Sequence, residues 1–120
     1  MATQNLFGAT SGLPQVLVSH WLAASETTQY TCPANSSVKV AAARLTNTTG
    51  SAVTVSISVV KSGDTAGGAN RVLSSYSLAA GDGIALDELK DLFLGPGDLI
   101  SAIASAATAV AFVMSGVVFS

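Results

Sequence analysis

The sequence predicts an all-β protein, an antiparallel β-sandwich of jelly-roll-like form with an extended N-terminal arm. Short apolar segments of strand length alternate with clusters of Gly, Pro, Asn, Asp and Ser, which is typical of sandwiches and small barrels of about seven or eight strands. One segment, AVTVSISVVK, alternates strictly between β-branched and mostly small polar residues. A length of 120 residues fits one domain with a real core.

Residues 1–24 are predicted to form an arm and a first strand, and residues 25–120 the sandwich domain. Residues 1–13, MATQNLFGATSGL, show no periodicity and carry one apolar pair, Leu6–Phe7, so we expect an extended arm. Pro14 then opens QVLVSHWLAA, in which alternate residues from Val16 to Trp21 indicate a strand. A short buried helix is the alternative for this segment.

Two further strands are predicted on either side of a proline turn. TQYTC is stopped by PANSS, which combines four turn-forming residues. VKVAAARLTNTT follows, and its alternation places Val38, Val40 and Ala42 on one face. The next turn is NTTGS. In the strand after it, Val53, Val55, Ile57 and Val59 are predicted to face the core.

The second half of the chain predicts a loop, a strand, one ambiguous segment and two closing strands. SGDTAGGAN is the loop, and RVLSSYSLAA is a strand that ends at LAAGDG. In residues 84–94, IALDELKDLFL, Leu86, Leu89 and Phe93 have helical spacing, and Asp87 is a candidate cap. Only a single strand or a single helical turn fits there, and both interpretations stay open.

Residues 99–119, LISAIASAATAVAFVMSGVVF, are uncharged and long enough to span a bilayer. However, no basic residue flanks them, a Gly-Pro-Gly-Asp turn precedes them, and the Ala-Ala-Thr at residues 106–108 divides them into two strand-length halves. We therefore expect two strands and no membrane partner.

The surface is predicted to be poor in charge. Charged residues make up 10% of the chain, against about a quarter in ordinary soluble domains, while apolar types reach 49%. The net charge is −2 and the five cations are scattered, which argues against nucleic-acid binding. So low a content of charged residues favours a surface that is buried against further copies of the chain and against neighbouring proteins.

No catalytic or metal-binding constellation is present, so we expect neither an enzyme nor a cofactor. Cys32 has no nearby His, Asp or Lys to activate it, and His20 is the only histidine. A single cysteine makes no internal disulfide, and zinc would lack two ligands. The acids between residues 82 and 98 match no calcium loop. Trp21, Tyr30 and Tyr76 leave open a sugar-stacking platform, with core packing as the usual alternative.

Several stretches resemble small β-sandwich structural proteins of tailed bacteriophages. They are YTCPANSSVKV, ARLTNTTGSAVTVSISVV, LGPGDLISAIAS and VAFVMSGVVF, and the resemblance extends over about residues 28–120. These pieces are turn and strand chemistry and are moderately specific. Two departures are Cys32, where the pattern has a valine-like residue, and the acidic DELKDLFL, whose local shape they leave unsettled. Residues 1–24 lie outside the resemblance.

The resemblance implies a non-enzymatic virion component, made in the cytoplasm of the bacterial host, that acts by oligomeric assembly. The expected place is the tail, collar or fibre-attachment region, and the expected partners are further copies and other virion proteins. One alternative is a capsid decoration (cement) protein, and one of another class is an adhesion module that binds a host-surface glycan. Leu6, Phe7 and Trp21 are the predicted assembly contacts.

Overall fold

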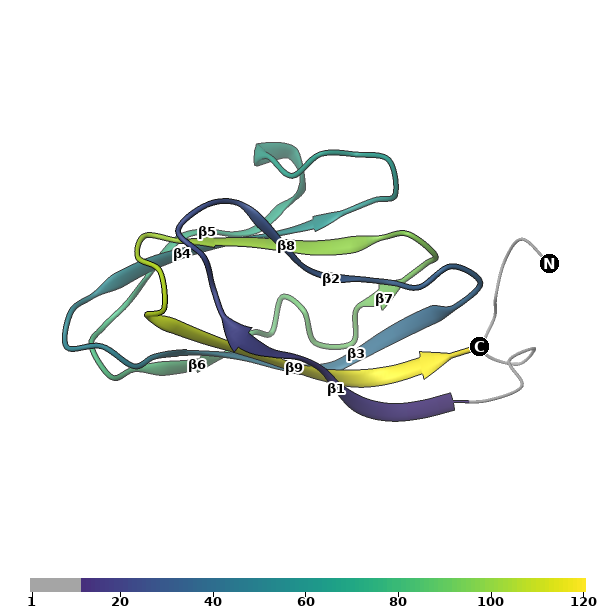
Figure 1. The fold of residues 1–120 in the computed structure, drawn as a ribbon, viewed down its shortest axis with the longest axis horizontal. Coiled ribbons are helices and arrows are strands. Elements are labelled where there is room, and N and C mark those ends of the chain that lie inside the picture. The colour runs from purple at the N-terminus through teal and green to yellow at the C-terminus, as the bar shows by residue number, and fades with distance from the viewer. Residues whose placement is uncertain (1–11) are drawn as a thin grey trace.

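The computed structural model describes residues 12–120, which form two antiparallel sheets packed face to face (Figure 1). This confirms the predicted all-β sandwich. A 3-10 turn, η1 (Gly68–Asn70), lies in the loop between the fourth and fifth strands. The strands are β1 (Gly12–Trp21), β2 (Thr27–Thr31), β3 (Ser37–Asn47), β4 (Val53–Val60), β5 (Arg71–Leu78), β6 (Gly83–Ala85), β7 (Phe93–Leu94), β8 (Leu99–Ala104) and β9 (Val110–Phe119).

The strand pairing is nested, as expected for a jelly roll. β4 pairs with β5, and outside them β3 pairs with β6 and β7, β2 with β8, and β1 with β9. The first sheet has the order β1-β9-β3-β6, with β7 also on β3, and the second has the order β2-β8-β4-β5. Consecutive strands therefore cross repeatedly between the two layers, which is how a jelly roll closes its core.

The core lies between the inner faces of the two sheets. β4 supplies Val53, Val55 and Ile57 to it, all at most 4% exposed, as the strict alternation predicts. Val59, the fourth residue of that prediction, is partly buried and packs against the core. β9 supplies Phe112 and Met114 from the opposite layer, both fully buried. The alternation of β4 is therefore the pattern of a strand with one face against a packed interior.

In the first sheet, two β-bulges shift the inward face of a strand by one residue. Between Val40 and Ala42 the register of β3 to β9 slips, so Ala43 is buried and Ala42 is exposed. The prediction that Ala42 shares a face with Val40 is therefore wrong, because the bulge at Ala41 resets the alternation. A similar slip in β1 lies between Val16 and Val18.

Residues 84–94 form neither a continuous strand nor a helical turn. β6 ends at Ala85, two successive turns bond Leu89 N–H to Leu86 C=O and Leu92 N–H to Leu89 C=O, and β7 then pairs with β3. Leu86 and Leu89 are buried, whereas Phe93 is 56% exposed. Of the three residues with helical spacing, Leu86 and Leu89 are therefore core residues and Phe93 is not. Phe93 faces outward because it belongs to the next strand.

The uncharged segment from residue 99 to residue 119 forms β8 and β9, in opposite sheets. Within residues 12–120 there is no helix long and apolar enough to cross a membrane.

Asn47 is a fully buried amide at the end of β3. Its Nδ2 donates to the carbonyls of Ser51, Leu78 and Ala79 at 2.8–3.2 Å, and its Oδ1 accepts from the N–H and hydroxyl of Thr49. One side chain thereby fixes the turn to β4 and the end of β5. The NTTGS turn that the sequence predicts depends on this residue.

Candidate assembly surface

The outer face of the first sheet carries most of the exposed large apolar side chains of the described residues. We call it the assembly face and define it by Val16, Trp21, Lys39, Arg44, Phe93 and Val113. Val16, Trp21, Phe93 and Val113 are between 43% and 61% exposed. Leu13, Val72 and Tyr76 are the other exposed large apolar residues in the part of the chain described, and they lie elsewhere.

The strand register places the residues of the assembly face in rows across the sheet. Phe93 of β7 pairs with Lys39 of β3, which pairs with Val117 of β9. Towards the other end, Trp21 of β1 pairs with Ala111 of β9, which in turn pairs with Thr46 of β3. The face therefore has aromatic and aliphatic groups along β1, a mixture of small residues and valines along β9, and both of its cations along β3.

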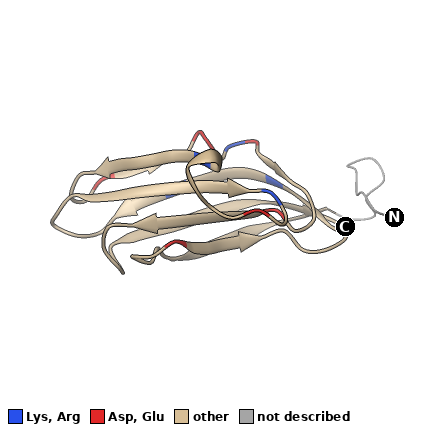
Figure 2. Cartoon of the chain, turned by 90° about the horizontal axis from the view of Figure 1, so that it is seen from above, with Lys and Arg blue, Asp and Glu red and all other residues tan. Residues whose placement is uncertain are grey.

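The two cations of the assembly face differ in their partners. Lys39 Nζ lies 3.7 Å from the Asp91 carboxylate and 5.7 Å from the centroid of the Phe93 ring, which is cation–π range. Arg44 is exposed and has no hydrogen bond or ion pair with any described residue. Figure 2 shows how few charged residues the strands carry. The guanidinium of Arg44 thus has N–H donors that no described residue occupies, on an otherwise weakly charged face.

The outer face of the second sheet is lined by hydroxyl groups. Ser58 and Ser101 pair across β4 and β8 and are 0% and 3% exposed. Glu26 reaches over them, accepting from Arg71 Nη1 at 2.8 Å and from Ser101 Oγ at 2.7 Å, and Arg71 also donates to Ser58 Oγ. These four residues satisfy one another and connect the β1–β2 loop, β8, β4 and β5.

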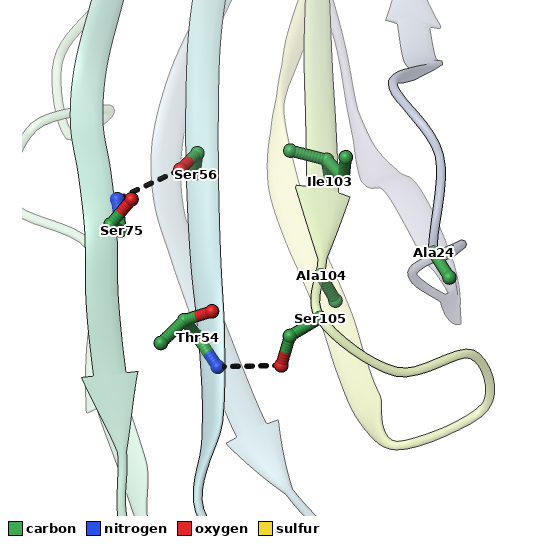
Figure 3. Close-up of a pocket in the computed structure, with 7 residues that line it drawn as sticks. All are labelled: Ala24, Thr54, Ser56, Ser75, Ile103, Ala104 and Ser105. Atoms are coloured by element: carbon green, nitrogen blue, oxygen red, sulfur yellow. Dashed lines mark hydrogen bonds between the residues drawn. The ribbon is translucent and has the colours of Figure 1, made fainter.

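A hollow of about 240 Å³ lies on this second face (Figure 3). Ser105 Oγ accepts from Thr54 N–H at 3.0 Å, and Ser56 Oγ accepts from Ser75 N–H at 2.8 Å. Its lining residues are Ala24, Thr54, Ser56, Ser75, Ile103, Ala104 and Ser105. No titratable group lines it, and Ser56 and Ser105 already bond to the backbone. The hollow therefore offers no catalytic group.

Cys32 is a core residue. It is 1% exposed, and its Sγ lies 3.4 Å from the Ser36 carbonyl and 3.7 Å from that of Leu94. Burial raises the pKa of the thiol, and the negative charge of Asp98 raises it further, so the thiolate is disfavoured. His20 does not bond to it: its Nε2 donates to Gln29 Oε1 instead.

The three aromatic candidates for sugar stacking lie on different elements. Trp21 belongs to the first sheet, while Tyr30 on β2 and Tyr76 on β5 are on opposite edges of the second. Tyr30 packs against the core. The described residues thus form no platform from these rings. They also hold no group of three His, Cys, Asp or Glu side chains suited to a metal ion.

Of the predicted assembly contacts, Trp21 lies on the assembly face, 48% exposed, whereas Leu6 and Phe7 lie outside the described residues. Sequence reasoning misses Phe93, Val113 and Arg44. The spacing of Phe93 suits a helical face, and Val113 lies within an uninterrupted apolar run. Arg44 carries one usable signal, because it is one of only five cations and has no acid within its own strand.

Comparisons of the chain with protein-family models, with curated proteins and with solved structures give no match.

Proposed function

We propose that this chain is a structural, non-enzymatic component of a tailed-bacteriophage virion that acts by oligomeric assembly. The tail, collar or fibre-attachment region is its proposed place, and its partners are further copies and other virion proteins. The observation that carries the proposal is the assembly face, where Val16, Trp21, Phe93 and Val113 stand exposed on one sheet. Exposed apolar groups gathered on one face are typical of surfaces that bind other proteins.

Two further observations support an assembly role. The jelly roll is a fold of viral structural proteins, although it also serves lectins and enzymes, so the fold supports the proposal without deciding it. The sequence resemblance over residues 28–120 is to small sandwich proteins of phage particles. The mechanism is packing: many copies share apolar and backbone contacts, and no covalent step is involved.

The test uses a phage whose genome encodes this chain. Particles are purified to homogeneity, and their proteins are identified by mass spectrometry and located by immunogold labelling. We expect the chain in stoichiometric amount, with the label on the tail or collar. An amber codon in its gene should give particles that lack this component, and supplying the purified protein should restore them.

Two results would count against the proposal. If infected cells make the chain but purified infectious particles lack it, the virion role is wrong. If the label lies over the capsid surface, the role holds but the placement changes to capsid decoration. The neighbouring genes give an independent measure, because flanking tail genes and flanking capsid genes favour different placements.

A further inference from the structure

We infer that two copies of this chain pack through their assembly faces about a two-fold axis parallel to β9, so that β1 of each copy lies over β3 of the other. The inference rests on the proposed function in so far as that function is assembly. It adds the partner, a second copy, and the symmetry of the contact. Its key contact joins the Trp21 indole of one copy to the Arg44 guanidinium of the other.

The first argument is that the assembly face is complementary to itself. Trp21 and Val16 lie along β1, on one side of β9, and Arg44 and Lys39 lie along β3, on the other side. A two-fold axis along β9 exchanges the two sides and keeps the position along the strand. It therefore sets the apolar side of each copy against the cationic side of the other.

The register determines which residues meet. Trp21 shares its row with Thr46 of β3, and Arg44 belongs to the next outward-facing row. That offset is about 6.6 Å along the strand, which an extended arginine side chain spans. A guanidinium stacks favourably on tryptophan, the aromatic side chain that gives the strongest cation–π contacts. Arg44 is available for it, because no described residue bonds to it, whereas Lys39 is held by Asp91 and Phe93.

Small residues on either side of Val113 in β9 leave room for close approach at the axis. Ala111 and Ser115 project outward there, with Val113 between them in the outward series. The alternative axis, perpendicular to the strands, would set β3 on β3 and bring the cations of both copies together. In the proposed arrangement the two Arg44 side chains lie on opposite sides of the axis, more than about 10 Å apart, where salt screens their repulsion.

The area of the face suits a weak, specific contact. β1, β9 and β3 are 10, 10 and 11 residues long. With about 3.3 Å per residue and about 4.8 Å between strands, the three strands present roughly 500 Å² per copy. The pair would bury about 1,000 Å², the size of weak and transient interfaces, so we expect a reversible dimer that forms with increasing concentration.

The edge of β1 is a weaker candidate for the same contact. Pro14 lacks an N–H, and the bulge after Val16 twists the strand, and both features are typical of edges protected against pairing with another chain. The face has no such protection.

The experiment uses two variants of the full chain, Trp21→Arg and Arg44→Glu. Both side chains are exposed, so each variant should keep the circular dichroism spectrum and thermal midpoint of the wild type. In sedimentation velocity the wild type should dimerise with rising concentration. Each variant alone should dimerise at least about tenfold more weakly, because Trp21→Arg sets a second cation against Arg44, and Arg44→Glu removes the cation from the indole.

Mixing the two variants is the decisive step. A mixed dimer contains one unaltered Trp21–Arg44 contact and one new ion pair between the introduced arginine and the introduced glutamate, so dimerisation should return towards the wild-type level. Trp21 is the only tryptophan, so Trp21→Arg contributes no indole fluorescence. Titrating it into Arg44→Glu should therefore shift the remaining Trp21 emission to shorter wavelength. Val72→Arg, on the exposed part of β5, is the matched control and should dimerise normally.

A wild type that remains monomeric at about 100 μM, or a mixture no stronger than either variant alone, would overturn the inference. Weakened dimerisation of Val72→Arg would also overturn it, because the contact would then include the second sheet. These outcomes are separable from the virion role. A chain found in particles but not self-associating keeps the proposed function, and a dimer absent from particles keeps only the inference.

Discussion

At the scale of single residues, Asn47 connects more of the fold than any other polar side chain described. Its amide is fully buried and bonds three carbonyls and two groups of Thr49, and its bond to the Leu78 carbonyl is itself buried. A buried carbonyl without a donor costs its full desolvation free energy, which exceeds the net gain from a typical hydrogen bond. The side chain therefore determines whether the ends of β3 and β5 stay together.

We expect Asn47→Ala to lower the free energy of unfolding by about 2–4 kcal/mol, since it leaves three carbonyls without this donor. Chemical denaturation followed by circular dichroism measures the change. Thr48→Ala is the neighbouring control. It removes one hydroxyl contact with the Ala109 carbonyl and should cost about 1 kcal/mol or less. Equal losses in the two variants would refute the role given to Asn47.

The raised pKa values of Cys32 and Tyr30 predict how the stability of the fold changes with pH. Burial raises the pKa of the Cys32 thiol above 9.0 and that of the Tyr30 phenol above 10.0. The unfolded chain loses these two protons at lower pH than the folded chain does. The contribution of the two neutral groups to folding stability is therefore complete below about pH 9, and it is lost as the pH rises through their pKa values in the folded chain. The thermal midpoint should therefore fall between pH 8 and about pH 10.5, and less steeply in Cys32→Ala. A flat profile would contradict this.

At the scale of the strands, β9 passes unusually close to β3 beside the bulge at Ala41. A Cβ on Gly116 would lie 2.2 Å from the Lys39 carbonyl oxygen, a distance that no packed atom tolerates. Gly116 is thus required by close approach of two backbones, which is a reason for glycine within a strand.

We expect Gly116→Ala to separate β9 from β3 and to lower the free energy of unfolding by about 3 kcal/mol or more, or to prevent cooperative folding. Gly50→Ala is the control, because a Cβ there has no atom within 4 Å. Thermal melts of both variants give the comparison. A Gly116→Ala protein as stable as Gly50→Ala would show that the two strands are further apart than described.

The Glu26–Arg71 pair holds the outer face of the second sheet together. The two side chains are partly exposed, at 30% and 22%, so solvent screening limits their interaction. We expect a double-mutant cycle of Glu26→Ala and Arg71→Ala to give a coupling of about 0.5–1 kcal/mol, smaller at high salt. No coupling at low salt would mean that the hydroxyls of Ser58 and Ser101 are the effective partners.

Which strands exist could be predicted from the sequence, but not how the bulges displace them. The alternation in β4 predicts its buried face correctly because that face remains regular against the core. The alternation in β3 predicts the wrong buried face after Val40, because three successive alanines give no sequence signal for the position of a bulge. Trp21 could be selected by type and position. Arg44 could not be matched to it, because their relation depends on β9, which lies between their strands.

At the scale of the whole molecule, the core formed by residues 12–120 begins at Val18, and Leu17 packs against it from the same strand. Residues 1–11 show no apolar periodicity in the sequence, so a chain that starts at Gly12 should keep the thermal midpoint within about 2 °C. If residues 1–11 form the expected arm to a neighbouring subunit, such a chain should be incorporated less well into particles while dimerising as before. Equal incorporation of the two chains would contradict the prediction of an arm. A lower thermal midpoint of the shortened chain would mean that residues 1–11 contribute to the stability of the fold.

The nested order of the strands also constrains how the protein is made. β1 is bonded only to β9 among the described strands, so the first sheet element to leave the ribosome has no ladder partner until the last has been translated. Of the strands described, only β4 and β5 pair as neighbours in the chain. Synthesis therefore makes the inner hairpin available early, while β1 stays without its ladder partner until β9 is made, and such unpaired strands expose a nascent chain to aggregation.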